Sequence, residues 1–290
     1  MFKIIGMTKL IWKLFKIVLT LLLAFLMYVV IGGVVPFLHH PDVSQTKKEA
    51  VESTQFYSDS VGPDRATIIE DNEEALKMRL RVIKDAQKTL ILSTFDFRSD
   101  DAGKDILAAL LNAADRGVKV EIFADGFNSI IQMENNDYFY ALSSNKNIKI
   151  IIYNQVNILI PWNGLGRMHD KYVIADDSLY ILGGRNTFGY FLGDYAGHKN
   201  YDRDVLVYNT GSKASSIYQI KDYYKKITSQ KCCSVFHCNE SLGEKNSVKK
   251  AEQELKKRYE SLENKYDKFL AENYDYKANT YETNKINLLS

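Results

Sequence analysis

A run of uncharged residues extends from Ile17 to Leu38 near the start of the chain. It is apolar on every helical face, and about 20 helical residues at ~1.5 Å each cross the hydrocarbon core of a bilayer. Residues 1–16 carry four lysines and no acid, which predicts a cytoplasmic N-terminus and a body on the far side of the membrane. An uncleaved signal anchor is the favoured interpretation. The alternative is a cleaved signal peptide, for which residues 31–33 offer only a poor cleavage site.

The rest of the pattern predicts an α/β fold, with a mixed β-sheet flanked by helices on both faces. Apolar residues at helical spacing predict helices at 73–88 (with Asp71 as N-cap), 103–116, 137–143 and 214–227. Runs of apolar and β-branched residues predict strands at 89–97, 118–124, 148–153, 171–175, 179–182 and 204–208. The strand–helix–strand order within 89–124 is a βαβ unit, so its two strands are expected to be parallel.

The tail has a different period. From Leu255 onward apolar residues recur at spacings of four and three as far as Phe269, with Lys and Glu between them, which predicts a long amphipathic helix. Such a helix could pair with a partner, but docking on its own domain is the favoured interpretation. The chain then divides into a tip and membrane anchor (1–38), a polar linker (39–70), the α/β domain (71–230) and a Cys-containing loop with the C-terminal helix (231–290).

The net charge and the spacing of the cysteines restrict the classes of function that fit the sequence. The formal net charge is +2, and because residues 1–16 contribute +4, the remainder sums to −2. A slightly negative body argues against broad nucleic-acid binding, which needs a cationic surface. Cys232, Cys233 and Cys238 make a poor metal-ligand pattern, and a disulfide of Cys238 with one neighbour in an oxidising exterior is the favoured interpretation.

The candidate chemistry is concentrated between residues 167 and 186. In a strand, His169 and Lys171 point to one face and Asp170 to the other, because side chains alternate. An imidazole beside an ammonium makes a site for an anion. Gly183-Gly184 permits close approach of a ligand to the backbone, and Asn186 can donate a hydrogen bond to it. This combination suits phosphoryl-like chemistry with a histidine nucleophile. Each signal alone is more often a solvated strand edge or a turn, but their order and spacing together are specific.

The spacing His169-x-Lys171-x4-Asp176, followed by Gly183-Gly184 and Asn186, resembles the signature of the phospholipase D superfamily. Three upstream stretches look like the first half of bacterial cardiolipin synthases, at 100–103, 113–118 and 123–126. The resemblance covers about residues 73–210.

The resemblance implies a two-step phosphodiester exchange that needs no metal or other cofactor. His169 would attack phosphorus and form a phosphohistidine, while Lys171 and Asn186 would hold the phosphate oxygens. Asp176 would support the site from behind. A carboxylate after the next strand would orient the histidine, with Asp204 as the best match and Asp202 as the second candidate.

Two departures from the family pattern stand out. Gly184 replaces a residue that is often Ser, and the adjacent Arg185 could restore the lost phosphate contact. Family enzymes use two copies of the motif, yet only His169 is followed two residues later by Lys. A homodimer, or a partner with a second motif, is therefore expected, and residues 284–290 look like the opening strand of a second half.

Three functions remain open. The first is a membrane-anchored phosphatidyltransferase or phospholipase of cardiolipin-synthase type, acting on a phosphatidylglycerol-like lipid. It is favoured by the anchor, the non-basic body and the apolar stretch 156–162, which could enter the membrane interface or simply be a buried strand and turn. The second is a phosphodiesterase or nuclease of the same superfamily. The third is a non-catalytic half-enzyme that recruits a partner.

Overall fold

The computed structural model describes residues 2–38, 42, 45, 57–164, 166–237, 240–271 and 273–288. The chain divides into two compact units. One comprises Met1–Gln45 with Val156–Gly166, and the other comprises Thr46–Gln155 with Arg167–Ser290.

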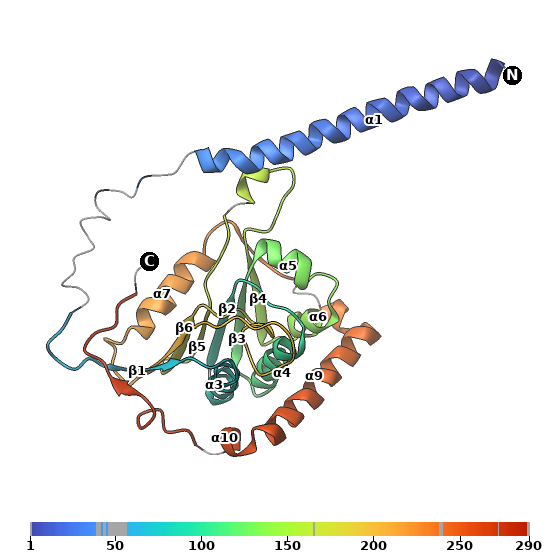
Figure 1. The fold of residues 1–290 in the computed structure, drawn as a ribbon. Helices are drawn as coiled ribbons and strands as arrows, with labels where there is room; N and C mark the ends of the chain where they lie inside the picture. Colours follow the sequence, from blue (N-terminus) through green and yellow to red (C-terminus); the bar gives the residue numbers. More distant parts are fainter. Residues whose placement is uncertain are drawn as a thin grey trace. The chain divides into compact units, whose positions relative to one another are not determined.

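The larger unit is built on one mixed sheet (Figure 1). Its strand order is β8-β4-β3-β2-β5-β6-β7-β1-β9, in which β2, β3 and β4 are parallel and every other pair is antiparallel. The strands are β1 (Asp64–Ile69), β2 (Thr89–Thr94), β3 (Lys119–Asp125), β4 (Ile148–Tyr153), β5 (Tyr172–Ala175), β6 (Leu179–Gly183), β7 (Asp204–Asn209), β8 (Cys233–Val235) and β9 (Tyr281–Glu282). The expected mixed sheet is confirmed.

Helices cover both faces of this sheet. They are α3 (Asn72–Asp85), α4 (Asp101–Asp115), α5 (Gly126–Gln132), α6 (Asp137–Ser143), α7 (Ile217–Thr228), α8 (Glu240–Gly243), α9 (Asn246–Lys265) and α10 (Asp267–Ala271). Asp71 caps α3 as expected, accepting the amides of Glu73 and Glu74 at 2.8 and 2.9 Å. The expected βαβ unit is β2–α4–β3, whose strands are parallel.

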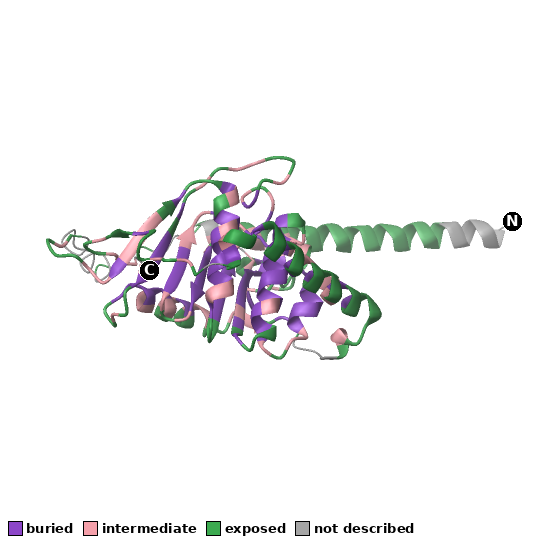
Figure 2. Cartoon of the chain, turned by 90° about the horizontal axis from the view of Figure 1, so that it is seen from below, coloured by how far each residue is buried: buried purple, intermediate pink, exposed green. Residues whose placement is uncertain are grey.

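Alternation of side chains along the strands divides the core into two clusters. In β2, Leu90 and Leu92 pack toward α3 and α4, whereas Ile91 packs toward α7 with Ile220 and Tyr224. Burying both faces of a central strand explains why β2 reads as a continuous apolar run. Figure 2 shows the resulting buried strands and inner helix faces in purple.

The tail helix docks on its own domain, as expected. Leu255, Tyr259 and Leu262 of α9 are buried in the cluster that α3 and α4 also share. The periodic stretch is not one helix, however, because α9 ends at Lys265 and a short α10 follows.

Two further features differ from the sequence-based expectations. Residues 64–69, placed in the linker, form β1, whose side chains are mostly half-exposed and so lack a strong apolar signal. Of the expected opening strand 284–290, residues 284–288 are not a strand, and 289–290 lie outside the described residues. Residues 285–288 lie against α7, where the amide of Leu288 donates to Gln219 Oε1 at 2.9 Å. The expected disulfide of Cys238 stays a prediction, because Cys238 lies outside the described residues; Cys232 and Cys233 are described as free thiols.

The smaller unit contains α1 (Phe2–Val34), η1 (Val35–Leu38) and η3 (Pro161–Asn163). Within α1, the segment Lys9–Val34 contains an 18-residue window with a mean hydropathy of 2.7, none of which is buried. By length and composition this helix can cross a membrane.

Candidate active site

The predicted site residues gather mainly at one edge of the sheet. The ends of β2 and β6 and the starts of β5 and β7 meet there, because Ser93 pairs with Tyr172, Tyr172 with Leu182, and Gly183 with Asp204. The carboxyl end of β3 reaches the same edge through its parallel pairing with β2.

His169 and Lys171 share one aromatic surface at this edge. The rings of His169 and Phe95 lie 4.6 Å apart edge-to-face, and Lys171 Nζ lies 5.4 Å from the same Phe95 ring. Lys171 Nζ also donates to the carbonyl oxygen of His169 at 2.7 Å. Asp170 faces the other way and accepts from Tyr223 of α7 at 2.8 Å. The alternation predicted for this segment is therefore confirmed, although β5 itself begins only at Tyr172.

A buried carboxylate fixes the backbone just before His169. Asp125, at the end of β3, accepts Arg167 Nε at 2.9 Å and Nη2 at 2.7 Å, and the amide of Met168 at 3.2 Å. Asp125 also caps α5. The Arg167 guanidinium lies 4.9 Å from the ring centroids of both Phe95 and Phe127. A bidentate ion pair of this kind holds a cation in a defined orientation beside the histidine.

Asn186 is oriented by the loop that follows β2. Its Oδ1 accepts the Asp96 amide at 3.2 Å, and the Thr187 amide donates to the Asp96 carbonyl at 3.0 Å. Because Oδ1 is used in this way, the amide group of the side chain is the part left to act as donor toward an anion.

The Gly183-Gly184 pair makes room for two carboxylates of the protein. A Cβ at Gly183 would collide with Asp204 Oδ1, and one at Gly184 would collide with the Asp202 carboxylate. The glycines were expected to let a ligand approach the backbone. Instead, they let the residues before and at the start of β7 approach β6.

Asp204 and Arg185 belong to a buried ion-pair cluster. Asp204 is 0% exposed, and its Oδ2 accepts Arg79 Nη1 at 2.8 Å and Arg185 Nη1 at 3.2 Å. The other nitrogens of Arg185 donate to Asn72 Oδ1 and to the Glu70 carbonyl. The expectation that Arg185 contacts phosphate does not agree with this geometry. Nor does the structure join Asp204 to His169, and Asp202 is the carboxylate that lies against Gly184.

Asp176 lies at the opposite end of β5. Its carboxylate accepts the amides of Gln87, Lys88 and Thr89 at 2.8 Å each, where β2 begins. Its own φ is +52°, a conformation that Asp tolerates better than most residues. It thus fixes the turn into β2 and does not reach the edge that carries His169.

The surroundings favour the neutral histidine. Partial burial, followed by the charge of Lys171, lowers the pKa of His169, although the charges of Asp170 and Asp125 oppose the shift. Burial likewise lowers the pKa of Lys171, against the charges of Asp170 and Asp202. A neutral imidazole has the lone pair that a nucleophile needs.

This electrostatic arrangement predicts a response to one substitution. In Lys171→Met the pKa of His169 should rise, because the nearby positive charge that favours the neutral ring is removed. Titration of the histidine ring signals by NMR in detergent measures it. Lys213→Met, which removes an exposed lysine beside Tyr218, is the control and should leave the His169 pKa unchanged. If the pKa of His169 were the same in Lys171→Met and Lys213→Met, the charge of Lys171 would not be what favours the neutral ring.

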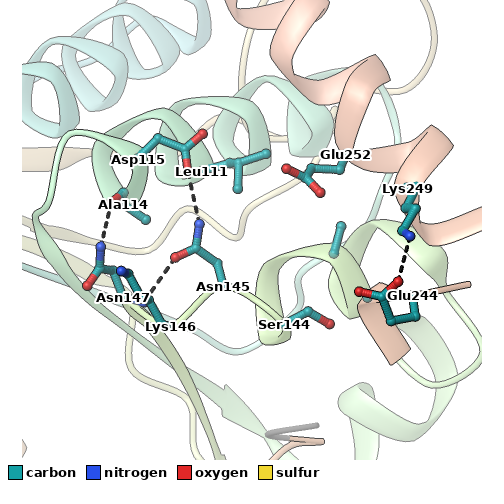
Figure 3. A pocket seen from close by; sticks show the side chains of 12 residues that line it. Leu111, Ala114, Asp115, Ser144, Asn145, Lys146, Asn147, Glu244, Lys249 and Glu252 are labelled. Atoms are coloured by element: carbon teal, nitrogen blue, oxygen red, sulfur yellow. Dashed lines mark hydrogen bonds and ion pairs between the residues drawn. The ribbon is translucent and has the colours of Figure 1, made fainter. Parts of the chain in front are cut away.

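A pocket of about 530 Å³ lies elsewhere (Figure 3). Its walls come from the end of α4, the α6–β4 loop and α8–α9, and its polar groups bond to one another. Asn145 bonds to Asp115 at 3.0 Å, and Lys249 bonds to Glu244 at 2.6 Å. None of the predicted site residues lines it. Within the described part of the chain, no three His, Cys, Asp or Glu side chains are grouped as metal ligands.

Three residues of the site had no role in the sequence analysis: Phe95, Asp125 and Arg167. A signal for Asp125 exists, because it ends a strand and is followed by Gly, and ligands of parallel sheets gather at carboxyl ends of strands. Nothing in the sequence pairs Asp125 with Arg167, which is 42 residues away.

Comparisons with known proteins agree with the motif. A family profile described as "Cardiolipin synthase, PLD-like domain" matches residues 80–227. Cardiolipin synthase B of Salmonella typhi is 32% identical over 142 residues, 48% of this chain and 34% of that protein. An uncharacterized protein of Helicobacter pylori is 30% identical over 166 residues, 53% of this chain and 32% of that protein.

The solved structure of NucT from Helicobacter pylori is 23% identical, with a TM-score of 0.47, and the match covers 60% of this chain and 99% of that one. The chain spans about one third of the length of the curated relatives that it matches. The profile match includes His169, Lys171 and Asn186 and extends over half of the chain. The chain therefore belongs to the cardiolipin synthase family of PLD-like domains.

Proposed function

We propose that this chain is a membrane-anchored phosphatidyltransferase or phospholipase of cardiolipin-synthase type, which acts through a phosphohistidine at His169. The observation that carries the proposal is the shared contact of His169 and Lys171 with Phe95. That contact keeps a neutral imidazole and a cation side by side at an open edge of the sheet. A phosphodiester placed there meets a nucleophile and a fixed positive charge together.

In the first step, a ring nitrogen of His169 uses its lone pair to form a bond to phosphorus. The bond from phosphorus to the leaving alcohol breaks, and the alcohol oxygen takes that electron pair and a proton from a second histidine. In the second step, an acceptor alcohol or water attacks the phosphohistidine and loses its proton to the same second histidine. His169 is then regenerated with its lone pair.

The phosphate oxygens would be held by Lys171 and by the amide group of Asn186. Arg167 is a third donor on the same side, since its guanidinium contacts Phe95 as His169 and Lys171 do. Asp202, rather than Asp204, is the carboxylate that we propose for the site, because it lies against Gly184 and its charge raises the pKa of Lys171. Asp176 and Arg185 would contribute to stability from outside the site.

A lipid substrate is supported by the surface next to Arg167. Helix α5 exposes Phe127, Ile130 and Ile131, which lie at helical spacing on one face. A cation bordered by exposed apolar side chains matches a phospholipid, in which a phosphate joins acyl chains. Nucleic acid would instead require a broader cationic surface, and the chain outside residues 1–16 sums to −2. The apolar α1 supports attachment to a membrane, with the N-terminus in the cytoplasm and the body outside.

The second histidine must come from another motif, since only His169 in this sequence is followed two residues later by Lys. We propose that a second copy of the chain supplies it. Two-fold pairing would then bring the two His169 residues to one shared site.

The direct test uses the full chain in vesicles that contain phosphatidylglycerol. We expect cardiolipin or phosphatidic acid as product. Single-stranded DNA and RNA serve as alternative substrates, and their cleavage without lipid turnover would replace this proposal with a nuclease. Turnover of none of these substrates by a well-folded chain would favour the non-catalytic half-enzyme.

Co-expression of wild-type and His169→Ala chains tests the shared site. If each site needs two His169 residues, an equal mixture should retain about one quarter of the wild-type activity, because only wild-type pairs work. Independent sites would retain about one half at the same mixing ratio. Light scattering on the same sample should give the mass of a dimer.

A further inference from the structure

An uncharged loop precedes the reacting histidine. No charged residue occurs between Lys149 and Arg167, and the loop Val156–Gly166 belongs to the same compact unit as α1. The loop is not a buried strand and turn, which is the second interpretation of the apolar stretch 156–162. Ile158, Leu159 and Trp162 are 58%, 64% and 47% exposed. Such an apolar surface requires a partner.

The loop is attached to α1 at one glycine. A Cβ on Gly32 would collide with the ring of Pro161, so only glycine admits this approach. One helical turn earlier, Tyr28 donates from its hydroxyl group to the Leu159 carbonyl at 2.7 Å, and its ring meets that of Trp162 edge-to-face at 6.3 Å. The contact therefore combines shape, a hydrogen bond and an aromatic pair.

The place of this contact along α1 indicates its depth in a bilayer. A hydrocarbon core of ~30 Å that begins after Lys16 spans about 20 helical residues and ends near residue 36. Gly32 lies four residues before that end, or about 6 Å inside it at ~1.5 Å per residue. Interfacial segments bury their apolar side chains to ~5–10 Å, and Trp and Tyr favour that zone.

We propose that Val156–Gly166 is a second membrane contact, held on α1 by Gly32 and Tyr28, which inserts Ile158, Leu159 and Trp162 into the boundary of a phospholipid bilayer. The inference rests on the proposed membrane anchorage. His169 is the third residue after Gly166, so the loop would tie the reacting segment to the lipid surface from which the substrate comes.

The test uses the full chain in phospholipid vesicles. Trp12 and Trp162 are the only tryptophans, so Trp12→Phe leaves Trp162 as the sole reporter. We expect blue-shifted emission that is quenched by lipids brominated close to the headgroup and is protected from aqueous iodide. Quenching by iodide would place Trp162 in water and overturn the proposal. Protection from both quenchers would indicate a protein partner or a second copy on the loop, and would also overturn it.

Gly32→Leu and Gly33→Leu, each in the Trp12→Phe background, form a matched pair. Leucine at Gly32 collides with Pro161, whereas a Cβ at Gly33 has no atom within 4 Å. Gly32→Leu should therefore reduce lipid quenching of Trp162 severalfold, and Gly33→Leu should not. Equal quenching in the two variants would show that the contact with α1 does not hold the loop.

Phosphatidylglycerol turnover by the same pair separates this inference from the proposed function. We expect Gly32→Leu to turn over lipid in vesicles more slowly than Gly33→Leu, while both hydrolyse a small water-soluble phosphodiester equally. If the parent protein turns over no phosphodiester, the proposed function fails. The fluorescence result still decides whether the loop enters the bilayer.

Discussion

Replacement of His169 by alanine is expected to lower phosphodiester turnover on the order of 10⁴-fold or more, because the variant lacks the atom that attacks phosphorus. The protein should remain folded, since His169 is only partly buried and packs mainly against Phe95. Steady-state turnover of phosphatidylglycerol measures the loss. An alkaline quench of the working wild-type enzyme should also give a phosphate-bearing adduct on the peptide that contains His169, and the variant should lack it.

The control for this variant is His237→Gln. His237 is a partly exposed histidine that bonds to Glu134 at 2.8 Å, away from the His169 edge of the sheet. It should retain wild-type turnover. Activity of His169→Ala within a few-fold of wild type would remove the phosphohistidine mechanism, whatever the substrate. An adduct that formed on another residue would do the same.

Much of the fold could be predicted from the sequence because its central strands are buried on both faces. Such strands are continuous apolar runs, and the bounds expected for β4 match those observed. Strand β1 was missed because its side chains are mostly half-exposed, and its identity as a strand depends on pairing with β7, far away in the chain. The local pattern of apolar residues does not indicate this pairing with β7.

The site residues likewise include some that the sequence could place and some that it could not. His169 and Lys171 could be placed on one face by alternation alone, which is a local property of an extended chain. The roles of Asp204 and Arg185 could not be predicted, because they depend on which side chains the register of β6 and β7 brings together. Gly183 pairs with Asp204 across these strands, so that carboxylate turns toward Arg79 and away from the open edge.

The glycine pair illustrates the limit further. Two glycines after a strand indicate a close approach, but the sequence does not say what approaches. The structure places Asp202 and Asp204 there, so Gly183 and Gly184 make room for the protein's own carboxylates. Gly184, where the family often has Ser, therefore accommodates Asp202, whose charge raises the pKa of Lys171.

Asp204→Asn is expected to lower the free energy of unfolding by about 3–5 kcal/mol, because it leaves Arg79 and Arg185 buried without their counter-charge. Both guanidinium groups are almost wholly buried, and one oxygen of Asp204 accepts from both. For a body of this size such a loss corresponds to a fall in melting temperature of roughly 6–20 °C. Chemical denaturation of the full chain in detergent measures it, and the fraction that remains folded should keep most of its turnover.

A matched control and a contrary outcome make this test decisive about the carboxylate's role. Glu70→Gln also removes a carboxylate from an arginine, but the Glu70–Arg203 pair at 3.0 Å is largely exposed, so the loss should stay below ~1 kcal/mol. If Asp204 instead oriented His169, Asp204→Asn would lower turnover by up to ~10⁴-fold, as loss of an orienting aspartate does in serine proteases. Its stability would then match that of Glu70→Gln. We expect the opposite pair of results, because the nearest cations to Asp204 are two buried arginines that cannot be left uncompensated.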